Sequence, residues 1–425
     1  MNTPQQMLQH LQVGDLDNAK KTFQKILKNG SDEEQFQLAE ELYHLGFLEE
    51  TKQLYEQLLT KYPDEGELKV LLAETLVDMD QEDAALEQLE QIPENDPVYP
   101  RALVLLADLY QSQGLFEVSE QKLLRAQQLL PNEPVIQFAL AELYASQGRH
   151  LEAIRHYEQL LEKGETEIAG TSIHHRLADT LSAGGAFEEA LPYYEKALDE
   201  RLEINTLFGY AFTAYQAGYY KLAIEKFTEL KELDPEYHSL YLYLAKAYEH
   251  EELLEKSVKT IEEGLKFNEF NKELLAFGGK IAMKLNNLEK AEHFFRQALV
   301  IDPSYLEAAL QLNRLLLHQE RYEEVIELVE MVEKEGEHDP QLDWDMAVSL
   351  QEVEQYEQAL KRYQQAYTFF KNHPEFLNDF GQFLLEEGML KEAYTIYQQL
   401  LQQDPTNEEY IMLVERLQED TRMLE

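Results

Sequence analysis

The chain has 425 residues, of which 44% are hydrophobic and 25 are tyrosines, so it has enough apolar surface to bury and is expected to fold. Its 37 basic residues face 82 acidic ones, and the net charge of −45 disfavours direct binding to nucleic acids or anionic membranes. The absence of cysteine excludes disulfides, thiolate nucleophiles and cysteine-ligated metals. With no signal peptide and no apolar stretch of membrane-spanning length, the sequence predicts a cytoplasmic protein.

A short turn recurs along the whole chain at intervals close to 34 residues. It begins with Gly or, in some copies, with Asp, Glu or Asn. The twelve aligned turn residues are Gly14, Gly46, Asp80, Gly114, Gly148, Gly185, Gly218, Glu252, Asn286, Glu320, Glu354 and Gly388. Self-similarity with this period predicts a stack of repeated helical units.

Each repeat is predicted to contain two helices, one before and one after the turn. A small residue such as Ala153 follows the turn by five positions, and a large residue such as Tyr157 follows four positions later. Another small residue, such as Ala141, stands seven positions before the turn. Small and large residues one helical turn apart predict helices that pack closely.

This pattern resembles the tetratricopeptide repeat (TPR) family, closely so from Tyr210 to Pro235 and from Asn286 to Pro303. The resemblance implies an all-α fold, a right-handed superhelical α-solenoid of about twelve two-helix repeats. The expected repeats within 1–407 are 1–31, 32–65, 66–99, 100–133, 134–170, 171–203, 204–237, 238–271, 272–305, 306–339, 340–373 and 374–407. Residues 408–425 are predicted to form a C-terminal capping helix, because Glu415 is polar where other repeats carry a small residue.

Two segments depart from the regular pattern. Residues 164–170 lengthen the junction between the fifth and sixth repeats by three residues and contain two glycines, which indicates either a hinge or merely a longer loop. Residues 1–11 lack the full helix pattern and are expected to form a looser N-terminal cap. No strand is predicted anywhere in the chain.

Motifs for catalysis and for cofactor binding are missing from the sequence. No phosphate-binding loop is found, and the adjacent His174 and His175 do not have the spacing of a two-histidine metal motif. With 82 acidic residues, no single carboxylate pair is informative about acid–base catalysis. We therefore expect no cofactor, no metal site and no enzymatic activity, and a hidden hydrolase or transferase is a remote alternative.

The TPR resemblance implies that the first helix of each repeat lines a concave, peptide-binding surface. Directly after the small residue of this helix, five repeats carry an acid, here called the acidic row: Glu40, Glu74, Asp108, Glu142 and Asp179. Three later repeats carry a base at the same position, here called the basic row: Lys246, Lys280 and Arg314. Lys284 extends this row by one helical turn.

The basic row is predicted to bind an acidic partner segment, with apolar contacts from residues three or four positions away. These neighbours are Phe208, Leu242, Leu310, Trp344 and Tyr215. Trp344 is the only tryptophan and is a candidate anchor, since aromatic residues dominate binding hot spots. The alternative is that Trp344 packs between repeats.

The acidic row has two interpretations. It is either an ordinary solvated helix surface or a second groove, which would bind a basic segment of a nucleic-acid machine such as RNA polymerase. The leading functional prediction is a non-enzymatic scaffold that binds partner segments on its concave face. The alternative is salt-sensitive self-association, in which the acidic half of one chain pairs with the basic row of another.

Overall fold

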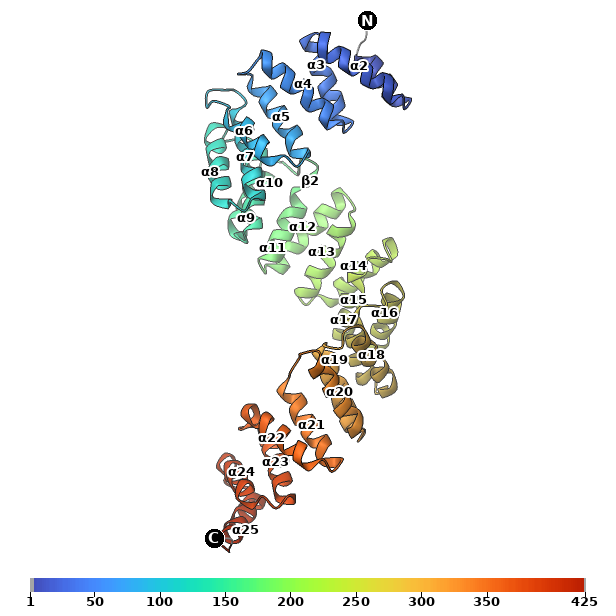
Figure 1. Cartoon of the computed structure of the whole chain (residues 1–425), viewed down its shortest axis with the longest axis vertical. Helices are drawn as coiled ribbons and strands as arrows, with labels where there is room; N and C mark the ends of the chain where they lie inside the picture. Colours follow the sequence, from blue (N-terminus) through green and yellow to red (C-terminus); the bar gives the residue numbers. More distant parts are fainter. Residues whose placement is uncertain (1–3, 424–425) are drawn as a thin grey trace. The chain divides into compact units, whose positions relative to one another are not determined.

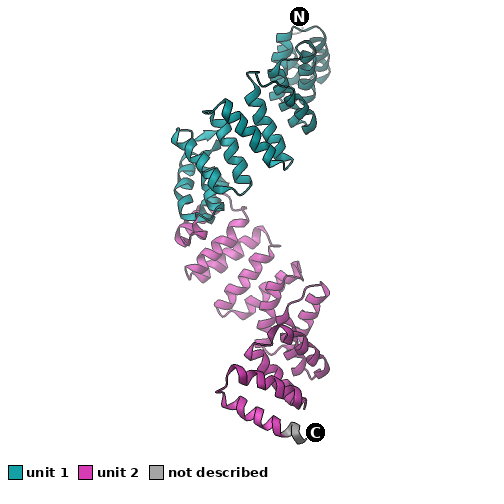
Figure 2. Cartoon of the chain, turned by 90° about the vertical axis from the view of Figure 1, so that its left-hand side faces the viewer, with its two compact units in different colours: residues 1–213 teal, residues 214–425 magenta. Residues whose placement is uncertain are grey.

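The computed structural model describes residues 4–423, with side chains up to residue 419. Within this range the chain forms 25 α-helices and one hairpin of two short strands. Successive helices pack side by side in pairs (Figure 1). The chain divides into two compact units, residues 1–213 and 214–425, with the boundary inside one helix (Figure 2). Each unit is described separately.

Unit 1 contains the first six helix pairs. Its elements are α1 (Pro4–Gln12), α2 (Leu16–Asn29), α3 (Asp32–His44), α4 (Leu48–Lys61), α5 (Gly66–Asp78), α6 (Glu82–Glu90), α7 (Tyr99–Ser112), α8 (Phe116–Leu129), α9 (Pro134–Ser146), α10 (His150–Glu162), β1 (Glu167–Ile168), β2 (Thr171–Ser172), α11 (Ile173–Ala183) and α12 (Phe187–Glu200). Helix α13 (Ile204–Gln216) contains the boundary with unit 2.

Unit 2 continues the same alternation. Its helices are α14 (Tyr220–Leu233), α15 (Ser239–His250), α16 (Leu254–Phe267), α17 (Lys272–Lys284), α18 (Leu288–Ile301), α19 (Leu306–His318), α20 (Tyr322–Lys334), α21 (Pro340–Glu352), α22 (Tyr356–Phe370), α23 (Pro374–Glu386), α24 (Leu390–Gln403) and α25 (Glu408–Met423). Two helices for each of twelve repeats and one terminal helix confirm the predicted all-α repeat fold.

The core follows the small and large positions of the repeat. Ala141 and Ala153 are fully buried in unit 1, as is Tyr157, which follows one helical turn later. In unit 2, a Cβ atom added to Gly279 would lie 2.4 Å from a ring carbon of Phe295. The two helices of a repeat therefore approach so closely that their contact position accepts only a small residue.

All twelve turn residues have a positive φ, between 56° and 82°. In the second repeat the chain leaves the helix at Gly46, and the next amide, of Phe47, donates a hydrogen bond to the carbonyl of Leu42 at 2.9 Å. This bond closes the end of the first helix as in a Schellman motif. The turn position therefore requires the left-handed conformation, which explains why Gly is frequent there.

The five turns that lack Gly carry backbone strain, so Glu320→Gly is expected to stabilise unit 2 by roughly 0.5–1 kcal/mol. Gly388→Ala should destabilise it by about the same amount, because nothing lies within 4 Å of the added Cβ and only the backbone conformation opposes it. Urea unfolding of both variants measures the effect. Changes of the same sign would contradict this explanation.

The longer junction between the fifth and sixth repeats contains a strand pair, so the expectation of no strand was wrong. Ile168 pairs with Thr171 across a tight turn in which Ala169 and Gly170 both have positive φ. The side chain of Ile168 is buried, and Arg201 donates a hydrogen bond to the carbonyl of Gly170 at 3.2 Å. The boundary between the units lies elsewhere, in α13, and a hinge at 164–170 stays a prediction.

The ends of the described chain are helical. The segment expected to form a looser N-terminal cap is helical from Pro4 as α1, with Met7 buried, and its role as a cap stays a prediction; Met1–Thr3 lie outside the described residues. Helix α25 matches the predicted C-terminal helix, except for residues 424–425, which also lie outside them. It packs on α24 with Leu417 buried and Glu415 exposed. Within residues 4–423, no helix combines the length and apolarity needed to cross a membrane.

Candidate functional site

The acidic row lies on the first helices of the second to sixth repeats, as predicted. These helices are α3, α5, α7, α9 and α11. Each acid follows a buried alanine, which packs against the second helix and thereby turns the carboxylate away from that contact. Glu40 and Asp108 are exposed, whereas Glu74, Glu142 and Asp179 are half-buried.

Three pockets of unit 1 include members of this row. A pocket of about 560 Å³ between α3, α4 and α5 includes Glu40. A second, of about 460 Å³, includes Glu74, and a third, of about 370 Å³, includes Asp108 and Glu142. The second and third pockets share three apolar residues, Val104, Leu105 and Val135. They therefore form one groove along α7 and α9, here called the unit 1 groove.

Arginines within unit 1 neutralise part of the acidic row. Arg101 binds Glu74 at 2.6 Å and Glu67 at 2.9 Å. The Nε atom of Arg176 donates to Glu142 at 2.7 Å. Glu142 also accepts a hydrogen bond from the hydroxyl of Tyr157, whose pKa is raised by burial and by Glu142.

Asp108 has no ion-pair partner among the described residues. Although the residue as a whole is exposed, its carboxylate is partly desolvated by its surroundings, and this desolvation, followed by the negative charge of Glu82, raises its pKa from the ordinary value. Both effects disfavour the ionised carboxylate. Glu40 likewise forms no ion pair within the described part of the chain. These two members of the acidic row are therefore the ones available to a cationic ligand.

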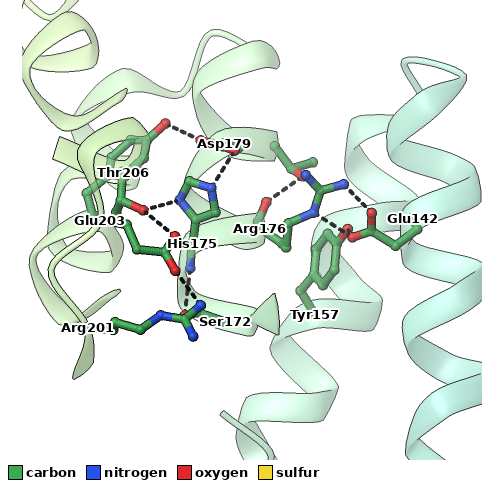
Figure 3. A network of polar contacts seen from close by, with 11 residues as sticks. Glu142, Tyr157, Ser172, His175, Arg176, Asp179, Arg201, Glu203 and Thr206 are labelled. Carbon is green, nitrogen blue, oxygen red and sulfur yellow. Dashed lines mark hydrogen bonds and ion pairs between the residues drawn. The ribbon is translucent and has the colours of Figure 1, made fainter. Parts of the chain in front are cut away.

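A polar network surrounds His175, the second of the two adjacent histidines (Figure 3). His175 contacts Asp179 through Nε2 at 3.2 Å and the hydroxyl of Thr206 through Nδ1 at 3.1 Å. Asp179 also accepts a hydrogen bond from Tyr194 at 2.7 Å. The order carboxylate, imidazole, hydroxyl resembles a catalytic triad. However, Thr206 is only 2% exposed, so its hydroxyl is not accessible to a substrate, and we interpret the network as structural.

The basic row lies on the first helices α15, α17 and α19 of unit 2. Lys280 forms an ion pair with Glu307, and Lys284 forms one with Glu249 at 2.6 Å. Lys246 forms no ion pair within the described chain, although its charge helps to lower the pKa of Glu307, and it lies over the ring of Tyr243, 5.5 Å from its centroid. These contacts leave the row less positive than the sequence suggests.

Arg314 differs from the other bases of the row. Its side chain is exposed and forms no ion pair with any described residue. Leu242 and Leu310, the predicted apolar neighbours, are half-buried. Tyr215 lies among the rings of Tyr220, Tyr243 and His250, with centroids 5.7 to 5.9 Å away. Phe208 belongs to unit 1, where it stacks on Phe212.

Trp344 packs between repeats, which was the alternative to its role as an anchor. Its ring lies 5.4 Å from that of Phe370 and 5.3 Å from that of Phe376, centroid to centroid. Its indole Nε1 donates a hydrogen bond to Asp379 at 3.1 Å. The half-buried indole thus joins α21 to the next repeat, and a role in partner binding stays a prediction.

One cluster of the described residues has the composition of a metal site. Ligand atoms of Glu333, His338 and Asp343 lie within 4.8 Å of one another. However, Arg362 donates to Glu333 at 2.7 Å and to Asp343 at 2.8 Å, and so already neutralises both carboxylates. A second cation would be repelled there, and we assign the cluster to an ion-pair network.

Asp345 is a buried acid next to this cluster. It accepts hydrogen bonds from Asn313 at 2.7 Å and from Gln341 at 2.8 Å, and burial raises its pKa. At pH values between the pKa of Asp345 in the unfolded chain and its raised pKa in the folded chain, the folded chain binds more protons than the unfolded one. The free energy of unfolding should therefore fall as pH rises through that range. We expect Asp345→Asn to flatten this pH dependence and to stabilise the chain at pH 7, measured by urea unfolding; a destabilised variant at pH 7 would contradict the prediction.

The sequence prediction missed the residues that form the unit 1 groove. Val104 and Leu105 precede the small Ala107 by three and two positions, and Val104 thus holds the position of Leu242 and Leu310, whose apolar side chains were assigned only to the basic row. A signal was present, because successive turns of one helix face carry these residues together with Asp108. Glu133 and Val135, at the start of α9, complete the groove.

Comparison with known proteins places the chain among TPR proteins. Residues 42–109, 282–343 and 173–206 match tetratricopeptide repeat families. Residues 111–165 match the family described as YpiA-like, tetratricopeptide repeats, and residues 340–407 match the corresponding C-terminal repeats.

The chain is 43% identical to the TPR repeat-containing protein YpiA of Bacillus subtilis over 421 residues, covering 99% of both chains. It therefore belongs to the YpiA-like family of TPR proteins. Among solved structures, a tetratricopeptide repeat protein from Parabacteroides merdae shares 19% identity with a TM-score of 0.42, covering 59% of this chain and 98% of that one. The Cut9–Hcn1 hetero-tetramer of APC/C gives 13% identity and a TM-score of 0.36, covering 97% and 95%.

Proposed function

We propose that the chain is a non-enzymatic scaffold that binds segments of partner proteins on the first helices of its repeats. The observation that carries this proposal is the unit 1 groove, in which apolar side chains remain open to solvent between acidic ones. Val135 is 46% exposed although it lies beside the apolar Val104 and Leu105. Clustered apolar residues with this exposure are typical of binding surfaces.

Site-specific photo-crosslinking tests this proposal. A photoreactive amino acid at position 135 lies in the groove, whereas one at Leu151, which is 71% exposed on the second helix α10, serves as the control. We expect position 135 to crosslink to defined segments of one or a few proteins in cell extract, identified by mass spectrometry, and position 151 to give none of them. Identical products at both positions would contradict specific binding at the groove.

The basic row supports a second candidate site, which would bind an acidic segment. Lys246 and Arg314 carry it, because neither forms an ion pair with a carboxylate of the described chain. Replacing Lys246, Lys280 and Arg314 with Glu should abolish capture of such a segment if this site functions. Unchanged capture would exclude the basic row.

Two finer proposals concern the partner. The first is that the acidic row binds a basic segment of a nucleic-acid machine such as RNA polymerase, because the two charges would be complementary. Self-association of acidic and basic rows is the alternative, and it predicts an oligomer whose mass in sedimentation falls as salt is added. A monomer at low and high salt would reject self-association.

A further inference from the structure

We propose that the unit 1 groove binds a segment in which basic residues stand on both sides of an apolar residue. This inference rests on the proposed scaffold function and specifies the chemistry of the partner.

The floor of the groove selects an apolar side chain. Its two pockets, of about 460 and 370 Å³, meet at Val104, Leu105 and Val135. These side chains project from α7 and α9 and are half-buried or exposed. An apolar side chain of a partner placed there would remove their surface from water, which favours binding.

The acids at the rim select basic residues. Glu133 lines one pocket and Asp108 lines the other, and neither forms an ion pair with a described residue. The other acids of the groove, Glu74 and Glu142, already have Arg101 and Arg176 as partners. The two acids without a partner therefore lie in different pockets, with the apolar residues shared between them.

Asp108 also has a physical reason to accept a cation. Partial desolvation and the nearby Glu82 both raise its pKa, so the ionised carboxylate is less stable there than in an ordinary aspartate. A Lys or Arg side chain at hydrogen-bonding distance would offset both effects. An acidic or phosphorylated segment would increase the repulsion.

The negative charge around the groove also favours a basic partner. Residues 66–146 contain four basic and fifteen acidic residues. This field attracts basic segments and repels acidic ones before contact, and the attraction weakens as salt screens it.

First helices of neighbouring repeats lie roughly 8–10 Å apart, so an extended partner advances about three residues per repeat. Basic residues on both sides of an apolar one match this spacing.

Three labelled peptides of about twelve residues, which span about 40 Å when extended, test the proposal with the full-length chain. The first repeats Lys-Leu-Ser, the second replaces each Leu with Ser, and the third replaces each Lys with Glu. Fluorescence anisotropy at about 150 mM salt measures binding. We expect the first peptide to bind at least about tenfold more tightly than the other two.

Matched variants locate the binding. The pair Asp108→Asn and Glu133→Gln should weaken binding of the first peptide about tenfold. The control pair Glu117→Gln and Glu158→Gln removes the same charge from exposed positions on α8 and α10 and should leave binding unchanged. Val135→Ser should also weaken binding, whereas Leu151→Ser should not. Circular dichroism confirms equal folding.

Four results would overturn the inference, the last of them together with the scaffold function. Equal binding of the Lys-Leu-Ser peptide and its Ser variant would show that charge alone acts, and equal weakening by both acid pairs would show that the groove is not the site. Binding of the Glu peptide alone, crosslinked to residues 214–425, would also overturn it while leaving the scaffold function intact. If no peptide binds and position 135 crosslinks to no protein, both proposals fail.

Discussion

Arg362→Met is expected to lower the free energy of unfolding of the C-terminal repeats by about 3–5 kcal/mol. Asp343 is 1% exposed and receives a hydrogen bond from Arg362 at 2.8 Å. Loss of the guanidinium would leave this buried carboxylate near the like charge of Glu333, with His338 at 3.2 Å as its remaining partner. Urea unfolding followed by the fluorescence of Trp344, which lies on the same helix as Asp343, measures the change.

Two control variants distinguish the loss of a buried ion pair from the loss of an exposed one. Arg296→Met removes an exposed arginine of the same unit that pairs with Glu292 and Glu324, and it should cost no more than about 1 kcal/mol. Adding Asp343→Asn to Arg362→Met should recover much of the lost stability, because the uncompensated charge is then absent. Equal effects of the two arginine substitutions would contradict this account.

Phe376→Ala is expected to destabilise the same region by about 3–5 kcal/mol. Phe376 is completely buried, and its ring lies 5.3 Å from that of Trp344 and 6.1 Å from that of Tyr363. The substitution would leave a cavity beside the indole. We therefore also expect a red shift of the Trp344 emission in the folded chain, which reports entry of water.

Phe369→Ala provides the matched control. Phe369 is 65% exposed, so its truncation should change stability by less than about 0.5 kcal/mol and should leave the Trp344 emission unchanged. A folded Phe376→Ala chain with the stability of the natural protein would show that Trp344 does not depend on this packing.

The structure changes the balance between the two candidate surfaces. The sequence favoured the basic row, because three cations in an acidic chain needed an explanation. In unit 2, however, Glu307 and Glu249 neutralise Lys280 and Lys284. In unit 1, Asp108 and Glu133 have no such partner and border an apolar groove. The groove therefore has the stronger physical basis for binding a partner.

The sequence by itself determined the repeat, its register and its helices. The reason is local: a left-handed turn residue such as Gly46 and a helix contact such as Gly279 with Phe295 lie within one 34-residue unit. Each restricts the residue type at its own position, so the pattern is visible in the sequence. The short strand pair at Ile168 was missed, because two-residue strands leave no periodicity.

Only the tertiary structure decided which charged residues are available to a partner. Glu74 and Arg101, or Lys280 and Glu307, are separated by 27 residues and come from different repeats. Whether such residues pair depends on side-chain directions across neighbouring helices, which a comparison of equivalent repeat positions does not contain. The same holds for Trp344, which packs between Phe370 of its own repeat and Phe376 of the following one.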